Sequence, residues 1–121
     1  MSRIMIADDS ESTRIALKNI ILDSNHELVA EAVDGLDAVE KFHSLSPDVL
    51  LLDIAMPKKD GLITLQELKR TTPQAKVIMI TASDDLKAIE DCMSAGALAY
   101  IIKPFEQNNV LQTISFALED N

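Results

Sequence analysis

The residues best suited to chemistry in this chain occur in four separate blocks. Asp8 and Asp9 follow a short apolar run near the N-terminus, and Asp53 ends an aliphatic run that is typical of a strand buried on both faces. Thr81 ends another apolar run, and Lys103 follows the last one. An ionised carboxylate in buried surroundings is costly unless its charge is compensated. The neighbours of Asp53 must therefore supply that compensation.

These residue types suit phosphoryl transfer if the blocks meet in space. Three carboxylates close together repel one another, and a divalent cation removes that repulsion. Mg²⁺ binds a few carboxylates while keeping several waters, which suits Asp8, Asp9 and Asp53, whereas zinc is disfavoured because the cluster has no His or Cys. Lys103 adds a positive charge for an anion such as phosphate, and Thr81 adds a hydroxyl donor. Asp53 is then the nucleophile that forms an aspartyl phosphate.

The hydrophobic pattern predicts five strands that alternate with five helices. The strands are expected at residues 4–7, 28–32, 48–53, 76–81 and 98–102, and the helices at about 13–23, 36–45, 61–71, 83–94 and 107–118. Ser10 or Ser12 could cap the first helix. Gly96 lies just past the fourth helix, where a left-handed residue is usual. The strand before residue 53 is the most hydrophobic and is expected at the centre of the sheet.

This alternation predicts a single α/β domain over residues 1–121, with a parallel sheet and helices on both faces. The carboxyl ends of parallel strands lie along one edge, where ligands bind in open α/β sheets. Each of the four blocks falls at such an end. The prediction is therefore that Asp8, Asp9, Asp53, Thr81 and Lys103 converge on one site.

Composition excludes several classes of protein. Hydrophobic residues make up 47% of the chain but aromatic residues only 3%, so the core must be aliphatic. The net charge of -9 argues against nucleic-acid binding, which needs clustered Lys and Arg. Cys92 is the single cysteine and cannot form an internal disulfide. No run approaches the ~18–20 apolar residues that span a bilayer, and the N-terminus lacks the features of a signal peptide, so we expect a cytoplasmic protein.

Taken in order, the four blocks resemble the motifs of response-regulator receiver domains. They are the pair Asp8-Asp9, the run Asp-Ile-Ala-Met-Pro-Lys-Lys-Asp-Gly at residues 53–61, the pair Thr81-Ala82, and Lys103-Pro104-Phe105. In size and layout the chain is similar to the stand-alone chemotaxis regulators of the CheY type. The resemblance implies the flavodoxin-like, CheY-like doubly wound fold, with strand order 2-1-3-4-5.

The resemblance also implies roles for individual residues. Asp53 matches the phosphoacceptor, and Asp8 and Asp9 match the Mg²⁺ carboxylates, with the Ala55 backbone carbonyl as a further ligand. Lys103 matches the lysine that contacts the phosphoryl group.

A conformational switch follows from the same resemblance. Thr81 matches the switch hydroxyl, and Tyr100 stands where the family has its rotating aromatic residue. Lys103-Pro104 matches a position that is usually a cis peptide. Ala55 and Ser83 are small where family members often carry larger polar or acidic groups, so we expect water to attack the phosphoryl group in a less organised way.

The function implied is that of a two-component receiver, phosphorylated by a histidine kinase of the CheA type and acting through phosphorylation-dependent protein binding. Chemotaxis or motility is the expected pathway, with a flagellar motor or adaptor protein as target and a monomer as the default state. Such a domain catalyses its own phosphorylation and dephosphorylation but is not an enzyme acting on a metabolite. A phosphorelay shuttle, or a receiver from a longer transcriptional regulator, is the alternative; the lack of a linker at the C-terminus mildly favours a complete protein.

The same residues also permit interpretations outside this family. Asp8 and Asp9 could be acids that stabilise a helix N-terminus, and Asp53 could cap the turn after its strand. An aspartyl phosphatase would want a second acid at position 55, where the chain has Ala55. A flavodoxin-like electron carrier would need a phosphate-binding loop after the first strand, and Asp8-Asp9 would repel that phosphate.

Overall fold

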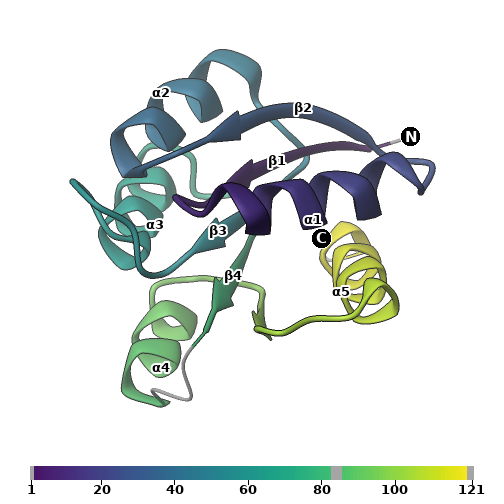
Figure 1. Cartoon of the computed structure of the whole chain (residues 1–121). Coiled ribbons are helices and arrows are strands. Elements are labelled where there is room, and N and C mark those ends of the chain that lie inside the picture. The colour runs from purple at the N-terminus through teal and green to yellow at the C-terminus, as the bar shows by residue number, and fades with distance from the viewer. Residues whose placement is uncertain (1, 83–85, 120–121) are drawn as a thin grey trace.

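The fold is a parallel sheet covered by helices on both faces (Figure 1). A computed structural model describes residues 2–82 and 86–119. Its strands are β1 (Arg3–Ala7), β2 (Glu27–Ala32), β3 (Val49–Asp53), β4 (Val77–Thr81) and β5 (Ala99–Ile102). Its helices are α1 (Glu11–Leu22), α2 (Gly35–Leu45), α3 (Gly61–Thr71), α4 (Leu86–Ser94) and α5 (Gln107–Glu119).

The strands pair in the order β2-β1-β3-β4-β5, and every pairing is parallel. The expected α/β class and the strand order 2-1-3-4-5 are therefore confirmed. The strand β3 lies at the centre, as its hydrophobicity predicted, and all five of its residues are buried.

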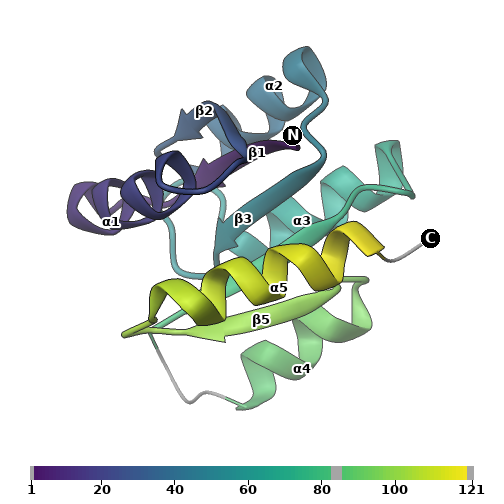
Figure 2. The same cartoon turned by 90° about the vertical axis from the view of Figure 1, so that its right-hand side faces the viewer.

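Two hydrophobic layers hold the helices against the sheet, and Figure 2 shows the helices on its two faces. Alternate residues of a strand point to opposite faces, so Leu50 and Leu52 pack on one side of β3 while Val49 and Leu51 pack on the other. The first layer includes residues of α2, α3 and α4, and the second includes residues of α1 and α5. Because apolar side chains cover both faces of the central strands, their carboxyl ends are rigidly placed.

The predicted element boundaries agree with the structure to within two residues where they can be compared. The first helix begins at Glu11 rather than at residue 13, because the Ser10 hydroxyl accepts a hydrogen bond from the Thr13 backbone N–H at 3.3 Å and caps the helix there. The expected start of the fourth helix, at residues 83–84, lies outside the described residues. Gly96 has the expected left-handed backbone, with φ of 109°. Within residues 2–82 and 86–119, no helix has the length and apolar character needed to cross a membrane.

The loop after β3 is held closely against the strand end. The Ile54 carbonyl accepts a hydrogen bond from the Gly61 N–H at 2.7 Å, and the Asp60 carboxylate caps α3 by accepting one from the Ile63 N–H at 2.9 Å. A Cβ at Gly61 would lie only 2.3 Å from the Asp53 carbonyl oxygen. The absence of a side chain at Gly61 is thus what lets α3 start directly behind Asp53.

We expect Gly61→Ala to destabilise the protein by about 1–3 kcal/mol, because the added methyl group meets backbone that has little room to move. Helix propensity alone predicts the opposite sign, a gain of up to about 1 kcal/mol. Urea unfolding measures the difference. Gln66→Ala, at an exposed position of the same helix, is the matched control and should change stability by less than about 0.5 kcal/mol. A Gly61→Ala protein as stable as the wild type would contradict the contact.

Candidate functional site

Three loops bring the site residues to the carboxyl edge of the sheet, and each loop is tied to a neighbouring strand. The Asp8 N–H donates to the Ala32 carbonyl at 3.0 Å, and the Ile54 N–H donates to the Ile80 carbonyl at 3.0 Å. The Lys103 N–H donates to the Thr81 carbonyl at 2.7 Å. Each bond continues the sheet ladder one residue beyond the end of β1, β3 or β5. The backbone at the site is therefore as firmly placed as the sheet itself.

The three carboxylates predicted to converge do so. Oxygens of Asp8, Asp9 and Asp53 all lie within 4.8 Å of one another. Asp8 and Asp53 are 1% and 4% exposed, whereas Asp9 is exposed to solvent. The cluster thus combines two buried acids with one at its open side, which is where a hydrated cation could enter.

Lys103 joins the two buried carboxylates. Its Nζ lies 3.1 Å from Asp8 Oδ2 and 3.7 Å from Asp53 Oδ1. One ammonium beside three carboxylates leaves two negative charges when all three are ionised, and a divalent cation would balance them. The ligand atoms are all carboxylate oxygens, which suits Mg²⁺ and does not suit zinc. The donor set in this structure therefore fits the expected metal.

The environment of Asp53 opposes its ionisation. Burial and the neighbouring Asp8 carboxylate raise the pKa of Asp53 to about 7, with Asp9 acting in the same direction. The Lys103 ammonium and the backbone N–H of Ala55 lower that pKa but only in part. A cation bound by the cluster would favour the ionised form. The same carboxylate is needed in that form to act as a nucleophile.

The alternative roles for the acids are not what the structure shows. The N-cap of α1 is Ser10, so Asp8 and Asp9 are not its capping acids. The N-cap of α3 is Asp60, not Asp53. The Asp8 carboxylate instead accepts a hydrogen bond from the Ser10 N–H at 2.8 Å, which orients it toward the cluster.

The remaining predicted residues that the structure describes lie on β4, on β5 and in the loop after β3. Thr81 ends β4 and is buried, and Tyr100 lies in β5 with 46% of its surface exposed. The Lys103-Pro104 peptide is cis, as the resemblance implied. Ala55 is exposed in the loop after β3, while Ser83 lies outside the described residues.

Sequence reasoning did not single out Arg14, which touches the acidic loop. Its Nη1 donates a hydrogen bond to the Asp8 backbone carbonyl at 2.7 Å. A basic residue one turn into the helix that follows an acidic pair is the only signal the sequence offers, and it is a weak one because solvated basic residues are common on helices.

Comparison with known proteins gives a consistent picture. The model of the response regulator receiver domain family matches residues 4–115. The chemotaxis protein CheY of Listeria monocytogenes is 41% identical over 117 residues, which are 97% of this chain and 98% of that protein. The chemotaxis protein CheY of Bacillus subtilis is 40% identical over 116 residues, 96% of this chain and 97% of that protein.

A solved structure extends the likeness to the fold. The crystal structure of the CheX-CheY-BeF3-Mg²⁺ complex from Borrelia burgdorferi matches with a TM-score of 0.93 and 33% identity, over 98% of this chain and 90% of that chain.

Without divalent cations, the contribution of Asp53 to the stability of the wild type should fall as pH rises from about 4 to about 7. In that window the folded Asp53 keeps a proton that the unfolded chain, with a pKa of 3.8, has released. Above pH 7 the folded state carries the full free-energy cost of burying the ionised Asp53 carboxylate. We therefore expect Asp53→Asn to be more stable than the wild type at pH 8 in EDTA, by on the order of 2 kcal/mol.

Urea unfolding at several pH values measures this difference. Glu40→Gln removes an exposed carboxylate of α2 and is the control; it should follow the wild-type pH profile. Equal stability of the wild type and Asp53→Asn at pH 8 would show that ionised Asp53 carries no such cost.

Proposed function

The chain belongs to the response regulator receiver domain family, and on that premise we propose that a histidine kinase phosphorylates it on Asp53 in a Mg²⁺-dependent reaction. The observation that carries the proposal is the cluster of three carboxylates within 4.8 Å, with the Lys103 ammonium between its two buried members. The fold alone would not suffice, since one fold hosts many functions.

The proposed reaction moves one phosphoryl group. An Asp53 carboxylate oxygen attacks phosphorus as the bond from phosphorus to the kinase histidine breaks, and the imidazole leaves. Bound Mg²⁺ would supply positive charge that neutralises phosphoryl oxygens. Asp8, Asp9, Asp53 and the Ala55 carbonyl are its proposed ligands. The chain provides position and charge, and it is a signalling domain rather than an enzyme that turns over a metabolite.

Lys103 has two proposed tasks in this site. Before phosphorylation its Nζ lies close to Asp8 and Asp53, where it offsets part of their repulsion. Afterwards the same ammonium can bind a phosphoryl oxygen. Because the Lys103 backbone is tied to the Thr81 carbonyl, the side chain can change partner without moving the loop.

We place the signal in chemotaxis or motility, because the full-length relatives at 41% and 40% identity are chemotaxis proteins. A CheA-like kinase would then be the donor, and a flagellar motor or adaptor protein the target. We propose the cytoplasm as the place of action. The strongly acidic charge of -9 fits a protein partner rather than nucleic acid.

The proposed switch connects Asp53, through Thr81, to Tyr100 on β5. Phosphorylation replaces the Asp53 carboxylate by an acyl phosphate that carries about two negative charges, and the buried Thr81 hydroxyl would turn toward them. The space it leaves would let Tyr100 move inward. Tyr100 is 46% exposed on the strand that pairs with β4, so it has an outward position to leave. The surface formed by α4, β5 and α5 would change with it.

Acetyl phosphate with Mg²⁺ should add about 80 Da to the wild type, one phosphoryl group, as measured by intact mass. Asp53→Asn should show no gain, because it lacks the nucleophile, and EDTA should abolish the gain in the wild type. Glu40→Gln removes an exposed carboxylate of α2 that is not part of the cluster, and it should behave as the wild type. No gain under any condition would mean that the domain binds its partner without phosphorylation, and the proposal would be wrong.

The switch can be followed through Tyr100, which is the single tyrosine of a chain without tryptophan. Beryllofluoride, an unreactive mimic of a phosphoryl group, should reduce quenching of Tyr100 fluorescence by acrylamide when Mg²⁺ is present. Thr81→Ala should bind beryllofluoride but leave the quenching unchanged, because the hydroxyl that moves is absent. A Thr81→Ala protein that shows the full wild-type change in quenching would contradict the proposed coupling of Thr81 to Tyr100.

A further inference from the structure

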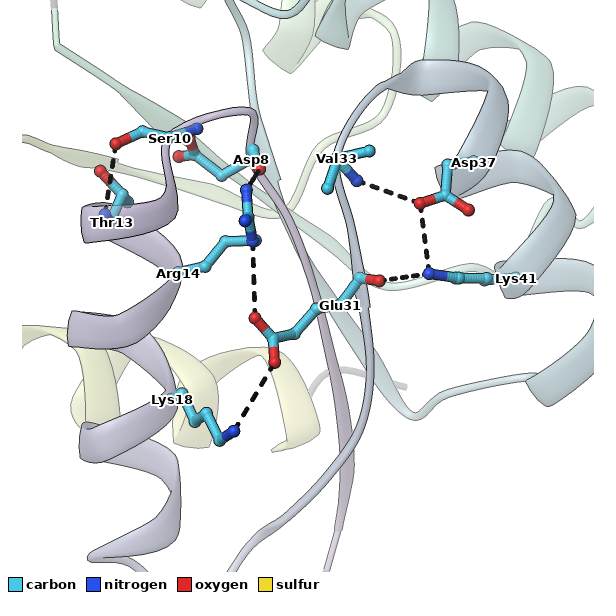
Figure 3. Close-up of polar contacts among 9 residues, drawn as sticks. All are labelled: Asp8, Ser10, Thr13, Arg14, Lys18, Glu31, Val33, Asp37 and Lys41. Carbon is cyan, nitrogen blue, oxygen red and sulfur yellow. Dashed lines mark hydrogen bonds and ion pairs between the residues drawn. The ribbon is translucent and has the colours of Figure 1, made fainter.

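A polar network connects the acidic loop to α1 and β2 (Figure 3). Arg14 in α1 lies at its centre: its Nη1 donates to the Asp8 carbonyl at 2.7 Å, and its Nε lies 3.5 Å from Glu31 Oε1. The Arg14 side chain is only 15% exposed. These contacts therefore keep the Arg14 side chain in one place, largely out of the solvent.

Glu31 is held from two sides. Lys18 approaches its other carboxylate oxygen at 3.9 Å, and Lys41 of α2 donates to its backbone carbonyl at 2.6 Å. The Glu31 carboxylate thus has a fixed place on β2, facing α1. It lies close to Arg14 Nε and offsets the positive charge of the guanidinium.

The three acids of that cluster differ in what supports them. Asp8 has the Ser10 N–H and Lys103, and Asp53 has Lys103 and the Ala55 N–H. For Asp9, the part of the chain that the structure describes supplies neither a hydrogen-bond donor nor an ion-pair partner to the carboxylate. The position of Asp9 is therefore set through its backbone.

The peptide that joins Asp8 to Asp9 is held through its carbonyl by Arg14, and the preceding peptide is held through its N–H by the sheet. The Asp8 N–H donates to the Ala32 carbonyl, and the Asp8 carbonyl accepts from Arg14. A peptide group is planar, so holding its carbonyl fixes the direction in which the next residue leaves. Without Arg14 that peptide could rotate, and the Asp9 carboxylate would move with it.

We infer that Arg14 is a positioning residue for the Mg²⁺ site, acting through the Asp8 carbonyl on Asp9. The inference rests on the proposed function, since it concerns the same metal site. Groups outside the ligand shell that orient ligands contribute substantially to metal affinity. Arg14 does so here by holding backbone, with Glu31 as its counter-charge.

The sign of the effect separates this role from simple electrostatics. Arg14 is a cation near a cation site, so Coulomb repulsion alone predicts that its removal strengthens Mg²⁺ binding. Loss of positioning predicts weaker binding. Lys18 provides the matched control because it pairs with the same Glu31 from the same helix, one turn away, without contacting the Asp8 carbonyl.

The experiment titrates Mg²⁺ alone into the wild type and into Arg14→Met, Lys18→Met and Arg14→Lys, and measures the affinity by isothermal titration calorimetry. Thermal melts in EDTA confirm that each variant folds. Arg14→Met should bind Mg²⁺ more weakly by about 3- to 30-fold, and Lys18→Met should match the wild type or bind slightly more tightly. Arg14→Lys keeps the charge and one donor and should fall between wild type and Arg14→Met.

Each outcome decides the inference. Equal or tighter binding by Arg14→Met, as for Lys18→Met, would overturn it. If Arg14→Met does not fold, Arg14→Lys carries the test alone, and wild-type affinity there would likewise overturn it. Failure of the wild type itself to bind Mg²⁺ would instead refute the proposed metal site, so the two failures are distinct.

Discussion

The mutual repulsion of three carboxylates at the end of a buried sheet is the constraint on which the rest of the site depends. The apolar layers around β3 are what make the repulsion strong, because they bury Asp53 beside Asp8 and raise the pKa of Asp53 to about 7. A more open sheet end would let water screen these charges. The same packing that stabilises the fold therefore leaves its functional edge in need of a cation.

The loops around this edge are arranged to hold that unfavourable cluster together. Each of the three loops carries the sheet ladder one residue further, through Asp8, Ile54 and Lys103. Gly61 lets α3 close on the back of Asp53 without a side chain in between. Arg14 and Lys103 approach from different elements, one at a backbone carbonyl and the other at the carboxylates. With the acids placed rigidly, the proposed cation and the proposed phosphoryl group would be the main variables in the local electrostatics.

The two ends of the strand order contribute differently to the site. The helix α1 supplies Arg14 and belongs to the layer that also contains α5. The switch proposed for Thr81 and Tyr100 runs instead along β4 and β5, where Tyr100 and Ile102 keep exposed apolar surface. The contacts of Arg14 therefore lie toward the β2 end of the strand order, and the proposed switch lies toward the β5 end.

Most of the architecture follows from local patterns in the amino-acid sequence. Alternation of short apolar runs with amphipathic segments located all ten elements, and the parallel arrangement followed from that alternation. It also placed Asp8, Asp9, Asp53, Thr81 and Lys103 at strand ends. These inferences succeed because the period of hydrophobicity and the position of a residue at a strand end are local properties of the chain.

The differences among these residues depend on contacts between segments that are distant in sequence. Adjacent in sequence, Asp8 is buried and Asp9 exposed, because Asp8 still pairs with β2 whereas Asp9 has passed the end of the ladder. The contact of Gly61 with Asp53 and that of Arg14 with the Asp8 carbonyl depend on how helices dock on the sheet. Burial, and the charges and donors that surround a group, are set by segments distant in sequence, so no local pattern encodes them.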